Sequence, residues 1–137
     1  GVILSNCVQL AGHVKVEDKA NVGGMAAFHH FTTVGRLAFV GGMTRVVRDV
    51  PPFMTVEGNP SKVRCVNFVG CNRSGMDSET ISELREAYRL IYRQQLPMHD
   101  ALGQLKKSSK PEILELVEFL KKSAEGRQGR AREALRK

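Results

Sequence analysis

Hydrophobic residues recur at every sixth position through the first fifty residues, and this period constrains the fold more than any other feature of the chain. An α-helix, with about 3.6 residues per turn, cannot keep such a period on one face over that length, and a flat strand has a period of two. The remaining solution is a coil of very short strands and corners that buries an aliphatic ladder along its axis. The ladder consists of Leu4, Leu10, Val16, Val22, Phe28, Val34, Val40 and Val46.

Glycine follows the ladder at Gly23, Gly35 and Gly41. We expect these glycines at corners that need unusual φ/ψ angles or close backbone approach. The recurrent Val-Gly-Gly steps resemble the hexapeptide repeat of left-handed parallel β-helices, in which three hexapeptides make one triangular coil. On that resemblance, residues 2–50 supply two to three coils, and the two prolines of Val50–Phe53 end the stacking. So few coils leave an open edge, and we therefore expect further coils before Gly1.

The rest of the chain is predicted to be helical. Asp77 is a suitable N-cap for a helix over about residues 78–94, because the apolar residues that follow it have helical spacing. A short helix is expected around residues 97–105, and Ser109–Glu112 has the pattern of a capping box that opens a third helix. The tail after Ser123 is expected to be frayed, or helical only on contact.

These boundaries predict a mainly β coil region followed by an α-helical domain. The left-handed β-helix coils occupy residues 1–57, and an extended link occupies residues 58–76. The helical domain with its basic tail occupies residues 77–137.

The net charge of +7 and the pI of about 9.7 favour a negatively charged partner. Tryptophan is absent and aromatic residues make up 6% of the chain, so the stacking surface of a single-strand nucleic-acid binder is poorly supplied and no nucleic-acid partner is expected. The apolar runs are all far shorter than the roughly 20 residues that a membrane span needs, so none is expected.

Cys7, Cys65 and Cys71 form no Cys-x-x-Cys pair and have no histidine at zinc-finger spacing. We expect reduced, mostly buried thiols in a cytoplasmic protein, with no metal and no cofactor. The histidines His13, His29 and His30 lie inside the coil region. Imidazole suits proton transfer near neutral pH, and on a coil surface of small residues these side chains are candidates for a site, although surface histidines are often inert.

A set of motifs in order along the first 95 residues resembles the UDP-N-acetylglucosamine O-acyltransferases, which perform the first step of lipid A synthesis. The motifs are Leu10-Ala11-Gly12-His13-Val14, Val22-Gly23-Gly24-Met25 with His29 after it, Val40-Gly41-Gly42, Arg48 to Phe53, Gly58-Asn59-Pro60, Val66 to Gly70 with Arg73, and Leu84 to Arg93.

The resemblance implies a homotrimer with active sites in clefts between neighbouring coils. A 3-hydroxyacyl chain would pass from acyl carrier protein to the 3-hydroxyl of UDP-N-acetylglucosamine by metal-free general-base catalysis, with the oxyanion stabilised by nearby donors. In the family the base is a histidine on a coil before the Leu-Ala-Gly-His motif. It would precede Gly1, so we expect no catalytic base in this chain and no activity from the chain alone.

The resemblance also assigns site residues. His13 would line the sugar and acyl site, His29 is the next active-site histidine, Asn67 and Arg73 would contact the nucleotide, and Gly42 would set acyl-chain length. The chain departs from the family where His30 replaces a usual Gln. It also has Val69 at a position that can be acidic and Ser74 where a second Arg can follow.

Three other readings remain open from the sequence. The coil can belong to another hexapeptide-repeat acyltransferase. A metal-dependent hydrating enzyme would need three converging histidines, whereas His29 and His30 are adjacent. The chain can also be a non-catalytic module that trimerises and docks carrier protein.

Overall fold

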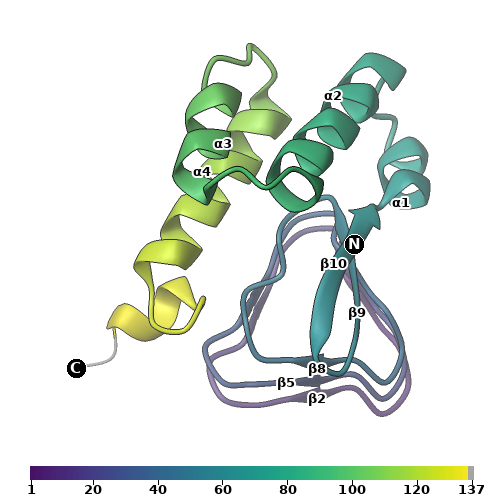
Figure 1. Cartoon of the computed structure of the whole chain (residues 1–137). Coiled ribbons are helices and arrows are strands. Elements are labelled where there is room, and N and C mark those ends of the chain that lie inside the picture. The colour runs from purple at the N-terminus through teal and green to yellow at the C-terminus, as the bar shows by residue number, and fades with distance from the viewer. Residues whose placement is uncertain (136–137) are drawn as a thin grey trace.

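The computed structural model describes residues 1–135, and its N-terminal part is a left-handed parallel β-helix with a triangular outline (Figure 1). Each side of the triangle is a strand of two residues, and the strands are β1 (Ile3–Leu4), β2 (Gln9–Leu10), β3 (Lys15–Val16), β4 (Asn21–Val22), β5 (Ala27–Phe28), β6 (Thr33–Val34), β7 (Phe39–Val40) and β8 (Arg45–Val46). The six-residue period and the prediction of three hexapeptides per coil are confirmed, because each of the strands β1 to β5 pairs in parallel with the strand three elements later.

Three sheets form the sides of the prism. Sheet A contains β1, β4, β7, β9 and β10, sheet B contains β2, β5 and β8, and sheet C contains β3 and β6. The second residue of each strand points inward, and Val22, Phe28, Val34, Val40 and Val46 are buried along the axis. The first residue points outward, which gives each sheet an outer face for ligands or partners.

The corners have a φ/ψ pattern that we did not expect. Non-glycine residues with positive φ recur every sixth position, and they are Cys7, His13, Lys19, Met25, Phe31, Leu37 and Met43. The glycines that follow the ladder do not have these left-handed angles. They instead allow the backbone of the next coil to approach closely. A Cβ on Gly23 would lie 2.5 Å from the backbone nitrogen of Gly42, and one on Gly35 would lie 2.5 Å from that of Pro52.

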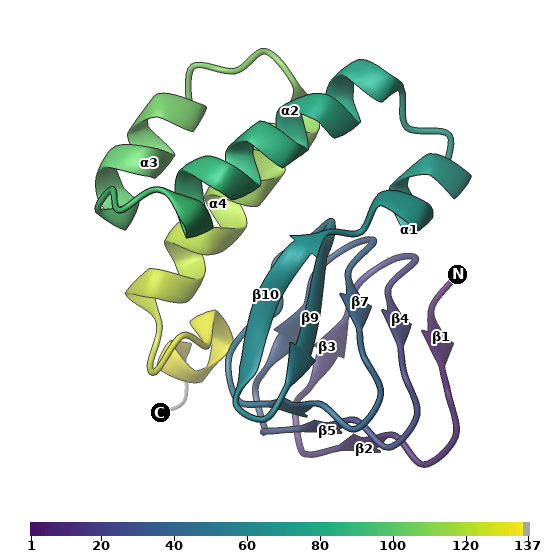
Figure 2. The ribbon, with the colours of Figure 1, turned by 45° about the vertical axis from the view of Figure 1, so that its right-hand side comes forward.

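The prediction that Val50–Phe53 ends the stacking is wrong. The chain passes the two prolines and forms β9 (Met54–Gly58), which pairs in parallel with β7 through Phe39 and Thr55. The step from β7 to β9 is the third successive turn, after β1 to β4 and β4 to β7. Strand β10 (Ser61–Val66) then pairs antiparallel with β9, and this hairpin closes one end of the coil (Figure 2).

The segment 58–76, expected to be an extended link, contains a helix. The side chain of Asn67 accepts a hydrogen bond from the backbone N–H of Gly70 at 3.1 Å and caps α1 (Phe68–Arg73). Apolar periodicity could not reveal this helix, because it is short and only Cys71 in it is buried.

The predicted helices of the C-terminal part are confirmed. Helix α2 (Ser78–Tyr88) is capped by Asp77, which accepts from Thr80 N–H at 2.7 Å, and it continues as the π-helix η1 (Arg89–Arg93). Helix α3 (Met98–Leu105) and helix α4 (Pro111–Glu125) follow.

The predicted capping box is wrong. Lys110 occupies the N-cap position of α4 without a side-chain cap, and Ser108 rather than Ser109 accepts from the Lys110 N–H, at 3.1 Å.

A second hydrophobic core joins the helices to the coil. Leu84, Ile113 and Leu116 pack there with Phe53 and Met54, which come from the last coil.

The prediction of mostly buried cysteines is wrong. Cys71 is buried, whereas Cys7 and Cys65 are exposed. Within residues 1–135, none of the helices combines the length and the apolar character needed to cross a bilayer.

The part of the basic tail that the structure describes is not frayed. After α4 the chain turns through Gly126 and returns to the coil, where it forms the 3-10 helix η2 (Ala131–Leu135). Arg130 and Glu133 are buried in this segment and form an ion pair. Residues 136 and 137 lie outside the described residues.

Candidate functional site

The predicted site residues lie in separate places on the prism. His13 follows β2, and His29 and His30 follow β5, so all three lie at the corner between sheets B and C. We call this the histidine corner. Asn67 and Arg73 lie over sheet A. In a triangular prism the corner between two sides lies opposite the third side, so the chain presents these two groups in opposite directions.

Ring contacts hold the histidine corner together. The exposed His13 has a φ of 64° and its ring stacks on that of Phe31 in the next coil, with centroids 4.6 Å apart and an interplanar angle of 8°. The His30 ring is nearly perpendicular to the same phenylalanine ring, with centroids 5.7 Å apart, and the centroids of the His29 and His30 rings are 3.9 Å apart. The corner therefore presents three imidazoles in one aromatic cluster at the outer surface.

A hydrogen bond fixes the tautomer of His29. Its Nδ1 lies 3.0 Å from the backbone carbonyl oxygen of His30. A carbonyl oxygen only accepts, so Nδ1 must carry the proton that it donates. In the neutral ring Nε2 is then unprotonated, and it can accept a hydrogen bond from a hydroxyl group of a ligand.

The C-terminal tail packs directly on the histidine corner. Arg132 donates to the backbone carbonyl of His13, and Arg130 donates to that of Val47 at 2.6 Å. Glu133 Oε1 lies 4.0 Å from His30 Nε2. The hydrogen bond from the Arg130 guanidinium lowers the pKa of the Glu133 carboxyl, which keeps a negative charge beside the imidazoles.

Sequence reasoning missed this contribution of the tail. The available signal was Asp49, a carboxylate three positions after the last ladder residue Val46, where a charged side chain needs partners. Its partners lie far along the sequence, at Ser123 and Ala131, so no local pattern could name them.

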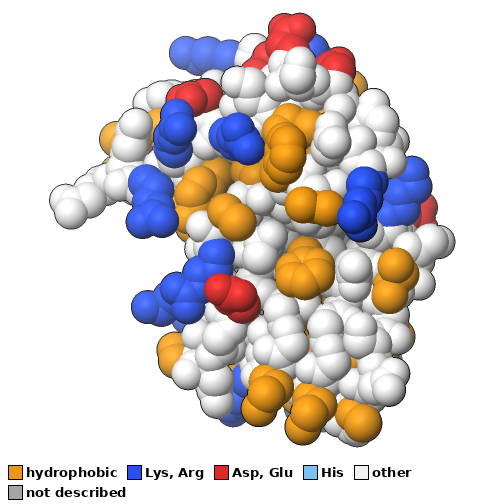
Figure 3. Space-filling view, turned by 90° about the vertical axis from the view of Figure 1, so that its right-hand side faces the viewer, with side chains coloured by type: hydrophobic (Ala, Val, Ile, Leu, Met, Phe, Trp, Pro, Cys, Tyr) orange, Lys and Arg blue, Asp and Glu red, His pale blue; other side chains and the backbone are white. Residues whose placement is uncertain are grey.

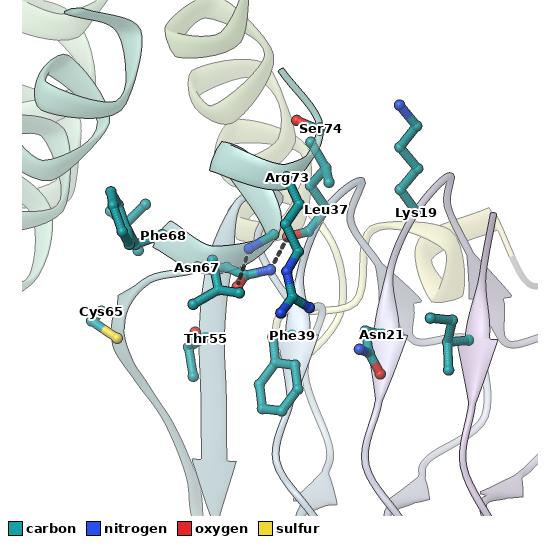
Figure 4. Close-up of a pocket in the computed structure, with 14 residues that line it drawn as sticks. Lys19, Asn21, Leu37, Phe39, Thr55, Cys65, Asn67, Phe68, Arg73 and Ser74 are labelled. Carbon is teal, nitrogen blue, oxygen red and sulfur yellow. Dashed lines mark hydrogen bonds between the residues drawn. The ribbon is translucent and has the colours of Figure 1, made fainter. Parts of the chain in front are cut away.

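A cavity of about 690 Å³ lies over the outer face of sheet A (Figure 4). Its floor is formed by outward-facing residues of successive strands, namely Asn21, Phe39 and Thr55, and helix α1 forms the opposite wall. In Figure 4 the Arg73 side chain extends from α1 toward Phe39. The lining contains Lys19 and Arg73 and no carboxylate among the described residues, so the cavity favours an anionic ligand such as a phosphate.

Asn67 has a structural task as well as a place in this lining. Its Nδ2 donates to the Leu37 carbonyl at 2.9 Å while its Oδ1 caps α1. Both ends of the amide are thus engaged, and Arg73 is the freer polar group in the cavity. Val69 and Ser74, where the sequence departs from the family pattern, line the same cavity.

Gly42 lies at neither group but at the corner between sheets A and B. It precedes the exposed Met43, and Met25 occupies the same corner one coil earlier. Figure 3 looks onto the sheet A side and shows a row of hydrophobic side chains along its lower edge. A Cβ on Gly42 would lie 3.3 Å from the Gly24 carbonyl oxygen, which is close, but Gly42 is exposed, so the space on its outer side is open.

Within residues 1–135, no three His, Cys, Asp or Glu side chains gather as a metal ion would require. The three histidines meet through ring faces and edges, a geometry that directs their nitrogen lone pairs to different places.

The chain is similar to a set of acyltransferases. Residues 49–129 match the family model described as Udp N-acetylglucosamine O-acyltransferase, Domain 2. The acyl-[acyl-carrier-protein]--UDP-N-acetylglucosamine O-acyltransferase of Gloeothece citriformis is 50% identical over 131 residues, which are 93% of this chain and 48% of that protein. The protein of the same name from Synechocystis is 49% identical over the same share of each.

Solved structures agree with these matches. The Arabidopsis UDP-N-acetylglucosamine acyltransferase superposes with a TM-score of 0.84 at 32% identity, over 89% of this chain and 45% of that one. The Bacteroides fragilis enzyme gives a TM-score of 0.85 at 30% identity, over 88% and 48%. The chain spans about half the length of the relatives it matches. It belongs to the UDP-N-acetylglucosamine O-acyltransferase family.

Proposed function

We propose that a full-length protein carrying this chain transfers a 3-hydroxyacyl group from acyl carrier protein to the 3-hydroxyl of UDP-N-acetylglucosamine. In the reaction a base takes the proton of the sugar hydroxyl, and its oxygen forms a bond to the thioester carbonyl carbon. The tetrahedral oxyanion then collapses, the carbon–sulfur bond breaks, and the carrier thiolate takes up a proton. The relatives named above support this assignment by their names.

The observation that carries the proposal is the division of the polar site residues between the histidine corner and the sheet A cavity. One substrate cannot reach both within a single prism. In a homotrimer about a three-fold axis, each chain can set its histidine corner against the sheet A cavity of a neighbour. The site would then lie between subunits, with hydroxyl recognition from one chain and phosphate recognition from the next.

The side chains of each group suit the part of the substrate that the group would bind. His29 can accept a hydrogen bond at Nε2, which suits a sugar hydroxyl, and His13 stands beside it on the same corner. Arg73 and Lys19 suit the diphosphate of a nucleotide sugar because a guanidinium and an ammonium both bind phosphate oxygens. We assign the acyl-length position to Gly42, where open space at the surface leaves room for a chain.

On this proposal residues 1–137 supply substrate-binding groups, and the general base is a histidine outside them. The isolated chain should therefore release no carrier thiol in an acyl-transfer assay. In the full-length protein, His13→Ala should lower kcat/KM by about 100-fold, the loss typical of a removed polar group at a reacting site. Turnover by the isolated chain, or full activity of the His13 variant, would contradict the assignment.

A second candidate is a trimerising module that docks carrier protein without catalysis. It is favoured only by the net charge of +7, and acyl transfer by the full-length protein would exclude it.

A further inference from the structure

A second cavity, separate from both groups of site residues, lies between the coil and the helices. It has a volume of about 550 Å³, within the usual range for small-molecule sites. One side is strand β10 of the β9–β10 hairpin, and the other is formed by η1 and α4 (Figure 2). We call it the hairpin groove.

Cations dominate the polar lining of the hairpin groove. Arg48, Lys62 and Arg93 all line it, and none of the three lies within ion-pair distance of a carboxylate in the described part of the chain. A fourth cation, Arg64, is ion-paired with Glu57, with its Nε 3.8 Å from the carboxylate. The stem of Arg48 packs against Gly129, which directs this side chain along the wall of the groove.

The carboxylate in the lining offsets only part of this positive charge. Asp49 borders the groove, but its two oxygens accept hydrogen bonds from Thr33 and Ala131 N–H groups and from the Ser123 hydroxyl, at 2.8 to 2.9 Å. Its single negative charge stands against the three unpaired cations Arg48, Lys62 and Arg93, so the groove keeps a positive potential.

A tyrosine offers an additional donor. Tyr92 belongs to the π-helix η1, and π-turns often occur at functional sites. Its hydroxyl has no hydrogen-bond partner among the described residues, whereas the neighbouring Tyr88 hydroxyl donates to the Arg64 carbonyl. Burial, and then the nearby Tyr88, raise the pKa of Tyr92, so its hydroxyl keeps its proton as a donor.

The remaining wall of the hairpin groove is apolar. Its side chains come from the coil, from β10, from α3 and from α4, and they are Pro51, Val63, Met98, Leu120 and Ala124. Cations alone would suit any small anion. Cations beside an apolar wall suit an anion that also buries hydrocarbon.

We propose that the hairpin groove binds an organic phosphate that carries a hydrocarbon body. Arg93 and Arg48 hold phosphate oxygens, the Tyr92 hydroxyl donates to one of them, and the hydrocarbon lies on Val63 and Leu120. The proposal does not depend on acyl transfer, because the groove contains neither the histidine corner nor the sheet A cavity.

Octyl phosphate is the probe, and titration calorimetry on the whole chain measures its binding. We expect inorganic phosphate to bind about tenfold or more weakly, because it lacks the hydrocarbon, and octyl glucoside to show no binding, because it lacks the charge. Binding should weaken as salt is added, since the cations are partly exposed.

Variants locate the site. Arg93→Gln should weaken octyl phosphate binding about tenfold, and Tyr92→Phe, which keeps the ring that packs in the fold, about threefold to tenfold. Arg89→Gln is the matched control on the same π-helix, because Arg89 pairs with Glu86 at 2.6 Å and does not line the groove. It should bind like the unchanged protein.

Two outcomes would overturn the proposal. One is binding that Arg93→Gln and Tyr92→Phe leave unchanged. The other is binding that Arg73→Gln weakens instead, which would place the probe in the sheet A cavity.

Discussion

Asp49 in the coil accepts a hydrogen bond of 2.9 Å from the backbone N–H of Ala131, near the end of the described chain. The same oxygen accepts from the Ser123 hydroxyl of α4, and the other oxygen accepts from Thr33 N–H in β6. One carboxylate thus ties the coil, the last long helix and the tail together. This junction keeps Arg132 and Glu133 against the histidine corner.

Replacing Asp49 with Asn should loosen the tail. The substitution turns one carboxylate oxygen into an NH₂ group. If the remaining oxygen still accepts the hydrogen bond from Thr33 N–H, the NH₂ group faces the N–H of Ala131, and two donors then oppose each other. We expect hydrogen exchange at the Ala131 amide to accelerate about tenfold or more. Asp18→Asn at an exposed corner is the control. Equal exchange in Asp49→Asn and the unchanged protein would contradict the role given to Asp49.

The stability of the fold should depend on the titration of Asp49. Burial holds the pKa of this carboxyl above the ordinary value of 3.8, although three hydrogen bonds and Arg130 oppose the shift. The native state therefore binds the proton more tightly than the unfolded chain does, and protonation stabilises it. As pH falls from neutral toward 3.8, the unfolding free energy of the unchanged protein should rise relative to that of Asp49→Asn. Denaturant titrations at several pH values measure this difference, and a difference that shrinks on acidification would be the opposite result.

The three cysteines should differ in reactivity. Cys7 and Cys65 are exposed, so a thiol reagent should modify both in the folded protein. Cys71 is buried in the helical core, and burial raises its pKa to about 11, so its thiolate is scarce and inaccessible. Mass spectrometry should find Cys71 unmodified until denaturant is added. Rapid modification of Cys71 at neutral pH would show that α1 does not pack as described.

Two glycines of the coil, Gly23 and Gly42, offer a matched pair of substitutions. Gly23→Ala would place a Cβ 2.5 Å from the Gly42 nitrogen and 2.9 Å from two more backbone atoms, and backbone cannot move aside easily. Its cost should be about 1–3 kcal/mol. Gly42→Ala meets one carbonyl oxygen at 3.3 Å and should cost under about 1 kcal/mol. Equal losses in thermal unfolding would argue against close stacking at Gly23.

Because a side chain at Gly42 should cost little stability, a substitution there can test whether this position sets acyl-chain length. In the full-length protein, Gly42→Met should fold and should shift product formation toward shorter acyl chains, because the added side chain occupies the open space at that corner. Competition between carrier proteins loaded with chains of different length measures the preference. An unchanged product distribution would remove Gly42 from the site.

The six-residue period of the sequence was enough to predict most of the coil. The ladder from Leu4 to Val46 predicted strand positions, pairing and an outward face, since a six-residue repeat has few physical solutions. It could not predict positive φ at His13 or Phe31, because the corners adopt left-handed angles with ordinary side chains in place of glycine. The continuation into β9 was missed because prolines at a corner do not interrupt the ladder of hydrogen bonds.

The candidate site was predictable as a set of residues and not as an arrangement. Family motifs named His13, His29 and Arg73, but only the triangular cross-section shows that the histidines and the arginine face opposite ways. The tail contacts of Arg130 and Glu133 connect residues more than eighty positions apart, and one-dimensional patterns carry no such information.

A mixing experiment tests the shared site most directly. Two variants of the full-length protein, one with His13 and His29 changed to Ala and one with Arg73 changed to Ala, are each expected to be inactive. Unfolded together in equal amounts and refolded, they should regain acyl transfer at about a quarter of the sites, because in a randomly mixed trimer that share combines an intact corner with an intact neighbouring cavity. If the mixture stays as inactive as its components, while refolded unchanged protein recovers activity, the two groups do not meet across a subunit interface.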